Sequence, residues 1–341
     1  MPDGINVALI GAERTGRIHA QNLAQRIPSA TLSLVVDTDY EAAQRLAGLF
    51  DVPRVSDDYQ DALSDPGIEA VLVCTPIATQ AVISRQAALA GKHVLCDKPI
   101  SHSLAEIGET LQVVAKAGVK FQVGFYRRFD PSFKRVREAI VSQEIGEPSL
   151  LHIVSREPAP PSIKYIRTSG GLFLDMTIHD FDMARYLIGA EVEEVFTAAS
   201  VRIDPRIGRA GDVDTAMIML RFANGVIGSI DNSRQTAYGV DQRVEVFGSR
   251  GSIMTLNSYP NQAIVCDSSG VRRDVPLSSF MDRYSDSFVA ELSAFTDAIL
   301  RDAPEPVTGE DARMAVVTAL AAAQSHREHR PVRLDDVLVG A

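Results

Sequence analysis

Cysteine, positive charge and long apolar runs are all scarce in this sequence of 341 residues. Its three cysteines, Cys74, Cys96 and Cys266, show no short metal-ligand spacing, so the sequence predicts reduced thiols in a cytoplasmic compartment and no disulfide framework. No apolar run approaches the ~18 residues that a membrane-spanning helix needs, and the first residues lack the charged-then-apolar pattern of a secretion signal. The formal net charge of −10 argues against nucleic acid or an anionic membrane as the main partner.

What the sequence does contain is ordinary material for a large globular core. Hydrophobic residues make up 45% of the chain and charged residues 23%, which are typical values for a soluble protein. The length favours two domains or one large one. No internal repeat and no low-complexity segment interrupts the chain.

The first motif is a glycine-containing turn between an expected strand and an expected helix. Residues 5–10 (INVALI) form a nearly continuous apolar run, typical of a strand buried on both faces. The turn GAERTG, from Gly11 to Gly16, follows at once, and a helical pattern begins at Arg17. This order is the context of a dinucleotide-binding fingerprint, whose usual form is G-x-G-x-x-G. Glu13 replaces the middle glycine, so the alternative interpretation is a purely structural turn.

An acidic residue at the end of the next expected strand supports cofactor binding. The apolar run 32–36 ends at Asp37, where a carboxylate can accept both hydroxyls of an adenosine ribose. A carboxylate there would also repel a 2′-phosphate, so Asp37 favours NAD over NADP. The cofactor-binding residues that we expect are Gly11, Glu13, Arg14, Thr15, Gly16, Asp37, Thr75, Pro76, Asp97 and Lys98.

Strand-like and helix-like segments keep alternating up to residue 123. We expect further strands at 70–74, 93–96 and 121–124, which predicts a parallel, doubly wound α/β Rossmann domain over residues 1–123. Ligands of such sheets lie beyond the carboxyl ends of the strands, where Thr75-Pro76 and Asp97-Lys98-Pro99 follow two of them. A lone loop lysine is usually a solvated charge, but Lys98 lies at the expected cleft before a proline, where a cis peptide is one alternative.

From residue 124 onward the pattern changes to strand-like segments separated by turns such as Asn224-Gly225. These segments predict antiparallel hairpins. We therefore expect residues 124–341 to form an α+β domain with a large open, mainly antiparallel sheet. Closing helices are expected at 286–301 and 309–329, and the second could pack back on the first domain. We interpret His326 and His329, at its polar end, as solvated.

One stretch of the second domain carries a candidate acid–base pair. The segment 170–189 (GGLFLDMTIHDFDMARYLIG) is read as one helix that begins after two glycines and stops at the last one. Positions four apart share a helix face, which places Asp175 beside His179. A carboxylate next to an imidazole orients the ring and stabilises its protonated form. The alternatives are a buried histidine satisfied by a neighbouring acid, or a solvated face that carries Asp175, Asp180 and Asp182.

Taken together, these motifs resemble a known family. The segments that carry the likeness are GAERTG, VVDTD, VCTP, CDKPI, GFYRRFDP, SREPAPP, GGLFLDMTIHDFDMARYL and AYGVDQRVEVFGSRG. They resemble the glucose–fructose oxidoreductase / inositol dehydrogenase / rhizopine-catabolism (Gfo/Idh/MocA) family, and within it the inositol 2-dehydrogenases. The resemblance extends over nearly the whole chain, from Ile5 to about Arg330.

This resemblance implies an NAD(P)-dependent oxidoreductase that transfers a hydride between nicotinamide and a secondary alcohol of a cyclic polyol or sugar. It also implies a homodimer or homotetramer, often assembled through the open sheet, and a chemistry that needs no metal. The family's catalytic lysine, aspartate and histidine match Lys98, Asp175 and His179. The substrate-binding residues that it implies are Lys98, Tyr126, Arg127, Glu157, Asp175, His179, Tyr238 and Tyr284.

Several positions depart from what the family usually shows. Asp97 stands where glutamate is usual, Tyr126 where asparagine is usual, Glu157 where aspartate or asparagine is usual, and Phe288 where tyrosine is common. A site that loses a hydroxyl partner discriminates against that polyol, so the identity of the polyol or sugar stays open. A catalytically weak NAD- or sugar-sensing regulator on the same scaffold is the alternative function. Glu13 supports that alternative, whereas the intact catalytic trio favours an enzyme.

Overall fold

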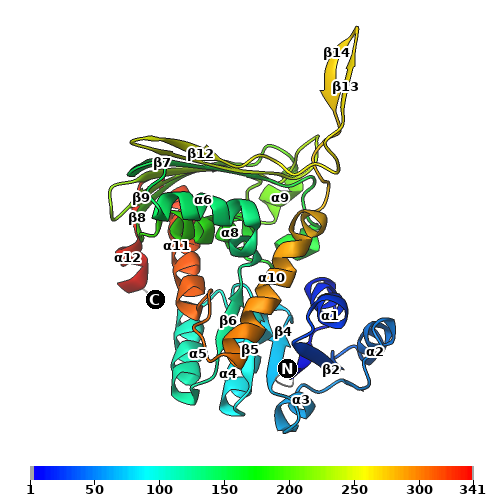
Figure 1. The fold of residues 1–341 in the computed structure, drawn as a ribbon. Helices are drawn as coiled ribbons and strands as arrows, with labels where there is room; N and C mark the ends of the chain where they lie inside the picture. The colour runs from blue at the N-terminus through cyan, green and yellow to red at the C-terminus, as the bar shows by residue number, and fades with distance from the viewer. Residues whose placement is uncertain (1–3, 340–341) are drawn as a thin grey trace. The chain divides into compact units, whose positions relative to one another are not determined.

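The computed structural model describes residues 4–339 and divides the chain into two units (Figure 1). Unit 1 comprises Met1–Phe129 and Asp286–Met314, and unit 2 comprises Asp130–Ser285 and Ala315–Ala341. The boundary expected after residue 123 falls at residue 129 in this division, and residues 286–314 return to unit 1. No helix in the described residues is long and apolar enough to cross a membrane.

Unit 1 is built on a six-stranded parallel sheet in the order β3-β2-β1-β4-β5-β6. Its strands are β1 (Ile5–Ile10), β2 (Ala30–Val36), β3 (Val55–Ser56), β4 (Ala70–Val73), β5 (His93–Asp97) and β6 (Phe121–Gly124). The helices between them are α1 (Arg14–Arg26), α2 (Tyr40–Leu49), α3 (Gln60–Ser64), α4 (Ile77–Leu89) and α5 (Leu104–Ala117). This is the strand order of the dinucleotide-binding fold, whose switch point lies between β1 and β4. The predicted α/β class is confirmed.

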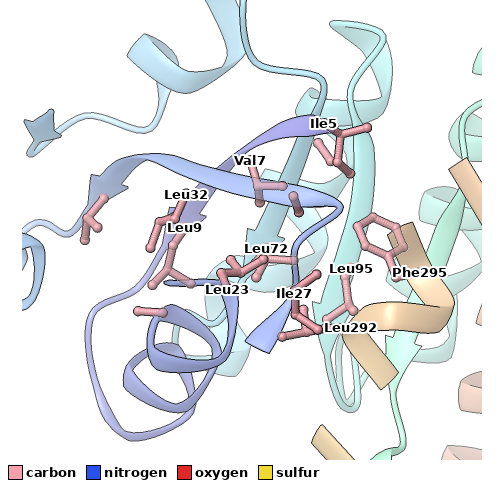
Figure 2. Close-up of a cluster of buried hydrophobic side chains, with 14 of the residues drawn as sticks. Ile5, Val7, Leu9, Leu23, Ile27, Leu32, Leu72, Leu95, Leu292 and Phe295 are labelled. Atoms are coloured by element: carbon pink, nitrogen blue, oxygen red, sulfur yellow. The ribbon is translucent and has the colours of Figure 1, made fainter. Parts of the chain in front are cut away.

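The core of unit 1 explains why residues 286–314 belong to it. Figure 2 shows Leu9 of β1, Leu72 of β4 and Leu95 of β5 in one buried cluster with Leu292 and Phe295. The last two lie on α10 (Phe280–Leu300), a helix that begins in unit 2. Each buried side chain of this size contributes ~1.5–3 kcal/mol relative to exposure. The second part of α10 is therefore a structural element of the Rossmann unit.

Unit 2 is built on a seven-stranded sheet in the order β12-β11-β7-β10-β9-β8-β15. Its strands are β7 (Pro148–Arg156), β8 (Val192–Ser200), β9 (Thr215–Phe222), β10 (Ile227–Ser233), β11 (Asp241–Gly248), β12 (Gly251–Met254) and β15 (Val332–Arg333). Neighbouring strands are antiparallel except for β7 and β10, which run parallel. The predicted open, mainly antiparallel sheet is confirmed, and the parallel pair at its centre was not foreseen.

Helices cover one face of this sheet. The helices that begin and end in unit 2 are α6 (Pro131–Val141), α7 (Ile163–Ile166), α8 (Ile178–Ile188), α9 (Pro205–Arg209) and α12 (Leu334–Val339). Figure 1 shows α6 and α8 on one face and, among the described residues, no helix over the opposite face. The side chains of β9 alternate between the two faces of the sheet. Those on the helix-covered face are buried, namely Ala216, Ile218 and Leu220, whereas Met217 and Met219 on the other face are exposed.

Two further elements complete the chain. The helix α11 (Gly309–Glu328) begins in unit 1 and ends in unit 2. The strands β13 (Ile264–Asp267) and β14 (Gly270–Arg273) pair only with each other and extend away from the large sheet of unit 2 (Figure 1). Every residue of this hairpin is exposed.

Packing requires two glycines in the turn after β1. Gly11 has a φ of 104°, and a Cβ atom there would lie 2.5 Å from the carbonyl oxygen of Cys74. A Cβ atom on Gly16 would lie 1.9 Å from the carbonyl oxygen of Gly11. The start of α1 is thus in direct contact with the end of β1, with no space for a side chain.

Replacing Gly16 with alanine should therefore destabilise unit 1. The added methyl group must displace backbone atoms, and we expect Gly16→Ala to cost ~2 kcal/mol or more of unfolding free energy. A matched control is Gly108→Ala inside α5, where the added atom meets nothing within 4 Å and alanine favours the helix by up to ~1 kcal/mol. Thermal unfolding without cofactor measures both variants. A Gly16→Ala melting temperature equal to that of the wild type would contradict the packing argument.

Candidate functional site

The glycine turn of unit 1 accepts Glu13 without strain. Glu13 is the N-cap residue of α1, with φ −80° and ψ −160°, a conformation that any L-residue adopts. Its side chain is exposed and does not cap the helix. The first turn of α1 contains no acidic residue, and a helix N-terminus attracts anions. The turn therefore fits the pyrophosphate of a dinucleotide, although its middle residue is not glycine.

Asp37 follows β2 and is fixed beside this turn. One carboxylate oxygen, Oδ2, accepts a hydrogen bond of 2.7 Å from the backbone N–H of Ala12, and Oδ1 accepts one of 2.9 Å from Asp39. A carboxylate oxygen can accept more than one hydrogen bond. Asp37 is half-buried and lies where a dinucleotide-binding fold places the ribose acid. These residues fit NAD.

Two more predicted cofactor segments follow β4 and β5. Thr75 and Pro76 come directly after Cys74 at the end of β4, and Thr75 Oγ1 accepts a 2.9 Å hydrogen bond from Thr79. Asp97 is the last residue of β5, and Lys98 follows it in a cis Lys98–Pro99 peptide. In a parallel sheet these strand ends meet at one edge. The structure thus places both segments at the edge that the sequence predicted.

Asp97 links β5 to the start of α1. Its Oδ1 accepts a 2.9 Å hydrogen bond from the backbone N–H of Lys98. Burial raises the pKa of Asp97, while the Lys98 charge, that N–H, the Thr15 side chain and the Arg14 charge oppose the rise. Thr15 and Arg14 open α1, so the carboxylate connects two of the segments expected to bind the cofactor.

A buried acid that the sequence did not single out lies close to Asp97. Glu291 of α10 is fully buried, and neither carboxyl oxygen has a hydrogen-bond partner among the described residues. Burial raises the pKa of Glu291 well above its ordinary value, and the charge of Asp97 raises it further. Gln122 of β6 donates a 3.1 Å hydrogen bond to the Glu291 carbonyl. Sequence reasoning missed Glu291 because α10 was assigned to the other domain.

The segment after β6 positions an aromatic pair. Tyr126 and Arg127 begin a short 3₁₀ helix, η1 (Tyr126–Phe129), and Arg127 is buried. The Tyr126 ring stacks on Phe288 with centroids 4.3 Å apart. Phe288 also meets the ring of His19 edge-on at 5.7 Å, and burial lowers the pKa of His19 to about 4. Phenylalanine at position 288 thus maintains ring packing without a hydroxyl group.

In unit 2, the helix with the candidate acid–base pair differs from the predicted one. Helical winding runs from Gly171 to Ile188, but residues Phe173–Thr177 form a π-helix, η2, ahead of α8. Such segments are frequent at functional sites, and Asp175 is the central residue of this one. Gly189 ends α8 with a φ of 70°, the left-handed stop that the sequence predicted.

Asp175 is held by two side chains that sequence reasoning did not identify. The hydroxyl of Tyr165 donates to Asp175 Oδ1 at 2.9 Å, and Arg234 Nη1 lies 3.4 Å from Asp175 Oδ2. His179 is buried four residues further along the same helical stretch. Tyr165 precedes the helix and Arg234 follows β10, so neither shares a local pattern with Asp175 that could have revealed the contact.

The interpretation of the three aspartates as a solvated face is wrong. Asp180 and Asp182 are both buried. Asp180 Oδ2 accepts a 2.9 Å hydrogen bond from Asn232 of β10, and Asn232 in turn accepts one from Thr177. Because α8 packs on the sheet, its polar residues are satisfied by sheet side chains.

The interpretation of His326 as solvated is also wrong. His326 is half-buried, and its ring lies 6.5 Å from that of Phe173 and 6.3 Å from that of His329. Burial lowers the pKa of His326, and the charges of His329 and Arg327 lower it further. His329 itself is exposed. Within residues 4–339, no three His, Cys, Asp or Glu side chains gather in a way that could hold a metal ion.

The remaining predicted substrate residues lie around the start of β11. Tyr238 donates a 2.8 Å hydrogen bond to Asp241. The next residue, Gln242, donates a 3.2 Å hydrogen bond to Glu157 and accepts one from the fully buried Tyr284. The structure therefore joins Glu157 and Tyr284 through one glutamine. Their contact with a substrate stays a prediction.

Comparison with known proteins agrees with this architecture. Residues 5–125 match the profile of an oxidoreductase family with an NAD-binding Rossmann fold, and residues 133–254 match the GFO/IDH/MocA C-terminal domain. The chain is 45% identical to the uncharacterized oxidoreductase YrbE of Bacillus subtilis, over 98% of each chain. It is 44% identical to myo-inositol 2-dehydrogenase of Thermotoga maritima, over 98% of this chain and 100% of the relative.

A solved structure supports the same assignment. The scyllo-inositol dehydrogenase of Lactobacillus casei, solved with bound NAD(H) and scyllo-inositol, matches with a TM-score of 0.92 and 28% identity. The match covers 98% of this chain and 100% of that one. Both family profiles, full-length relatives and a full-length structure thus coincide with the motifs of the sequence. The chain belongs to the Gfo/Idh/MocA family of oxidoreductases.

Proposed function

We propose that this protein is an NAD-dependent dehydrogenase that transfers a hydride between nicotinamide and a secondary alcohol of a cyclic polyol, with inositol as the first candidate. The observation that carries the proposal is the combination, in one family member, of an NAD-type Rossmann unit with a helix bearing Asp175 and His179. Relatives named as myo-inositol and scyllo-inositol dehydrogenases support the substrate class.

The cofactor would be held by residues of unit 1. Gly11 and Gly16 permit the tight turn, the N-terminus of α1 would bind the pyrophosphate, and Asp37 would accept hydrogen bonds from the ribose hydroxyls. Bound NAD supplies the hydride acceptor. Seven further residues complete the proposed set, namely Glu13, Arg14, Thr15, Thr75, Pro76, Asp97 and Lys98.

Three side chains would act on the alcohol. His179, as a neutral imidazole, takes the hydroxyl proton while the hydride leaves the same carbon. Lys98 donates a hydrogen bond to the reacting oxygen and stabilises its developing negative charge. Asp175 orients the imidazole or binds a neighbouring hydroxyl. Tyr126, Arg127, Glu157, Tyr238 and Tyr284 are the proposed substrate contacts.

The proton acceptor can be tested directly. We expect His179→Ala to lower kcat for myo-inositol or scyllo-inositol oxidation by ~10²–10⁴-fold, since positioned proton transfer contributes that much. NAD binding, followed by nicotinamide fluorescence of the reduced form, should stay unchanged. The exposed His329 provides the control, because His329→Ala removes an imidazole of the same unit. Wild-type turnover in His179→Ala would refute the role.

Cofactor preference should depend on Asp37. Asp37→Asn removes the negative charge that would face a 2′-phosphate but leaves an oxygen able to accept from Ala12. We expect the preference for NAD over NADP, measured as a ratio of dissociation constants, to fall by ~10-fold or more, equivalent to ~1.4 kcal/mol. The exposed Asp57 offers a control of equal charge in the same unit, as Asp57→Asn. An unchanged ratio in Asp37→Asn would show that another group selects the cofactor.

Self-association is proposed through the helix-free face of the large sheet. The strand registers pair Phe196 with Met219 and Leu150 with both Phe247 and Ile227 on that face. Phe196 and Met219 are 39% and 55% exposed. Apolar side chains grouped on a sheet face mark an association surface, and a symmetric homo-oligomer buries such a face against its own copy.

A charge placed on this face should weaken the oligomer. Met219→Glu puts a carboxylate between Phe196 and Ser229, its neighbours on β8 and β10. Sedimentation analysis at micromolar concentration should show a smaller species than the wild type. Leu89→Glu, at an exposed apolar position of α4, is the matched control. An unchanged mass for Met219→Glu would mean that copies associate elsewhere or that the chain is monomeric.

Two further points complete the proposal. The three cysteines are free thiols, which supports a cytoplasmic location. Glu13 was the departure that supported the regulatory alternative, but its backbone is unstrained and its side chain is exposed. The dehydrogenase is therefore the function that we advance.

A further inference from the structure

Arg234 is a buried cation whose two terminal guanidinium nitrogens contact two different carboxylates. Its side chain is 3% exposed and lies just beyond β10. Nη1 lies 3.4 Å from Asp175 Oδ2, and Nη2 lies 3.3 Å from Asp212 Oδ2. The Arg234 backbone N–H is fixed as well, by a 2.9 Å hydrogen bond to the carbonyl of Asp214. Asp212 therefore holds the guanidinium independently of Asp175.

Asp212 is attached to the helix that carries Asp175. Its Oδ1 accepts a 2.9 Å hydrogen bond from the backbone N–H of Leu172, in the first turn of the helical stretch. A Cβ atom on Gly171, where φ is 80°, would lie 2.7 Å from the same oxygen, so the glycine makes this approach possible. A carboxylate at a helix N-terminus is electrostatically favourable. Asp212 thus fixes the start of the helix and the position of Arg234 together.

We propose that Arg234 is a positioning residue, which clamps the Asp175 carboxylate in a single orientation with Asp212 as its anchor. This inference rests on the proposed function of Asp175 and His179. Tyr165 holds the other oxygen, Oδ1, at 2.9 Å, so both oxygens of Asp175 have fixed partners. A carboxylate held this way can direct its charge or its remaining lone pairs at one place on the substrate or imidazole.

The geometry requires arginine. A guanidinium has donors in a rigid planar fork and can bridge two carboxylates, whereas an ammonium group is a single point charge. Because Arg234 is almost fully buried, it acts on the reaction only through the residues that it touches. Removing it would leave two acids, Asp175 and Asp212, without their shared cation.

The test is a double-variant cycle on turnover. Arg234→Met is expected to lower kcat for inositol oxidation by 10- to 100-fold, with a change in KM of less than threefold. Asp175→Asn is expected to lower kcat at least as much. If Arg234 acts through Asp175, the double variant should be no more than threefold slower than Asp175→Asn alone. Effects that multiply in the double variant would overturn the proposal.

Arg185→Met is the matched control. Arg185 lies on α8, its side chain is 10% exposed, and it forms hydrogen bonds of 2.6 and 2.7 Å with Glu191 at the far end of the helix. Loss of this ion pair should lower the melting temperature and leave kcat within twofold of the wild type. If Arg185→Met loses as much kcat as Arg234→Met, the loss of any ion pair near this helix lowers kcat. That outcome would contradict a specific positioning role for Arg234.

Two outcomes separate this inference from the proposed function. If the wild type oxidises no polyol, both fall together. If the wild type is active and His179→Ala is not, but Arg234→Met keeps full kcat, only the inference falls. Should Arg234→Met fail to fold, Asp212→Asn replaces it in the same cycle, because it removes the charge that anchors Arg234 and keeps the arginine itself. A cooperative thermal unfolding transition of each variant confirms that unit 2 is folded.

Discussion

The geometry of the candidate site depends on buried charges that must each find a partner. A guanidinium or carboxylate removed from water costs several kcal/mol unless it is paired. In unit 2, Arg234 meets this requirement between Asp175 and Asp212, and Asp180 meets it through Asn232. The helix that carries the candidate catalytic residues is therefore fixed to the sheet by polar contacts as well as by apolar packing. Its orientation follows from where those partners lie.

In unit 1, two acids at strand ends accept hydrogen bonds from backbone N–H groups. Asp37 accepts from Ala12, and Asp97 accepts from Lys98. Each contact fixes a loop at a strand end, so the carboxylates that are proposed to face the cofactor also shape the loops around it. Glu291 has no such partner, and burial raises its pKa. A protonated carboxyl avoids the cost of a buried charge, so this acid can stay buried near Asp97.

Local sequence patterns predicted the strands and helix ends that depend only on residues near one another in the chain. The strands Ile5–Ile10 and Phe121–Gly124 lie where the apolar runs placed them, and Gly189 ends α8 as the sequence predicted. The return of α10 to unit 1, the parallel pairing of β7 with β10 and the clamp from Arg234 depend on contacts distant in sequence. Periodicity carries no information on such contacts. Asp175 and His179 were found because they are four residues apart; Arg234 is 59 residues from Asp175.

The proposed substrate residues are themselves linked by contacts between distant parts of the sequence. Glu157 stands where a shorter acid or amide is usual, and one of its oxygens accepts from Gln242. Gln242 also accepts from Tyr284, so Glu157 and Tyr284 share one hydrogen-bond partner. Phe288, which lacks a hydroxyl, stacks on Tyr126, a residue that replaces asparagine. One departure, Glu157, is thus linked to Tyr284 through hydrogen bonds, and two others, Tyr126 and Phe288, are linked to each other by ring packing. Exchanging a single residue of a pair would disturb its partner, so substrate preference in this chain should change by pairs of residues.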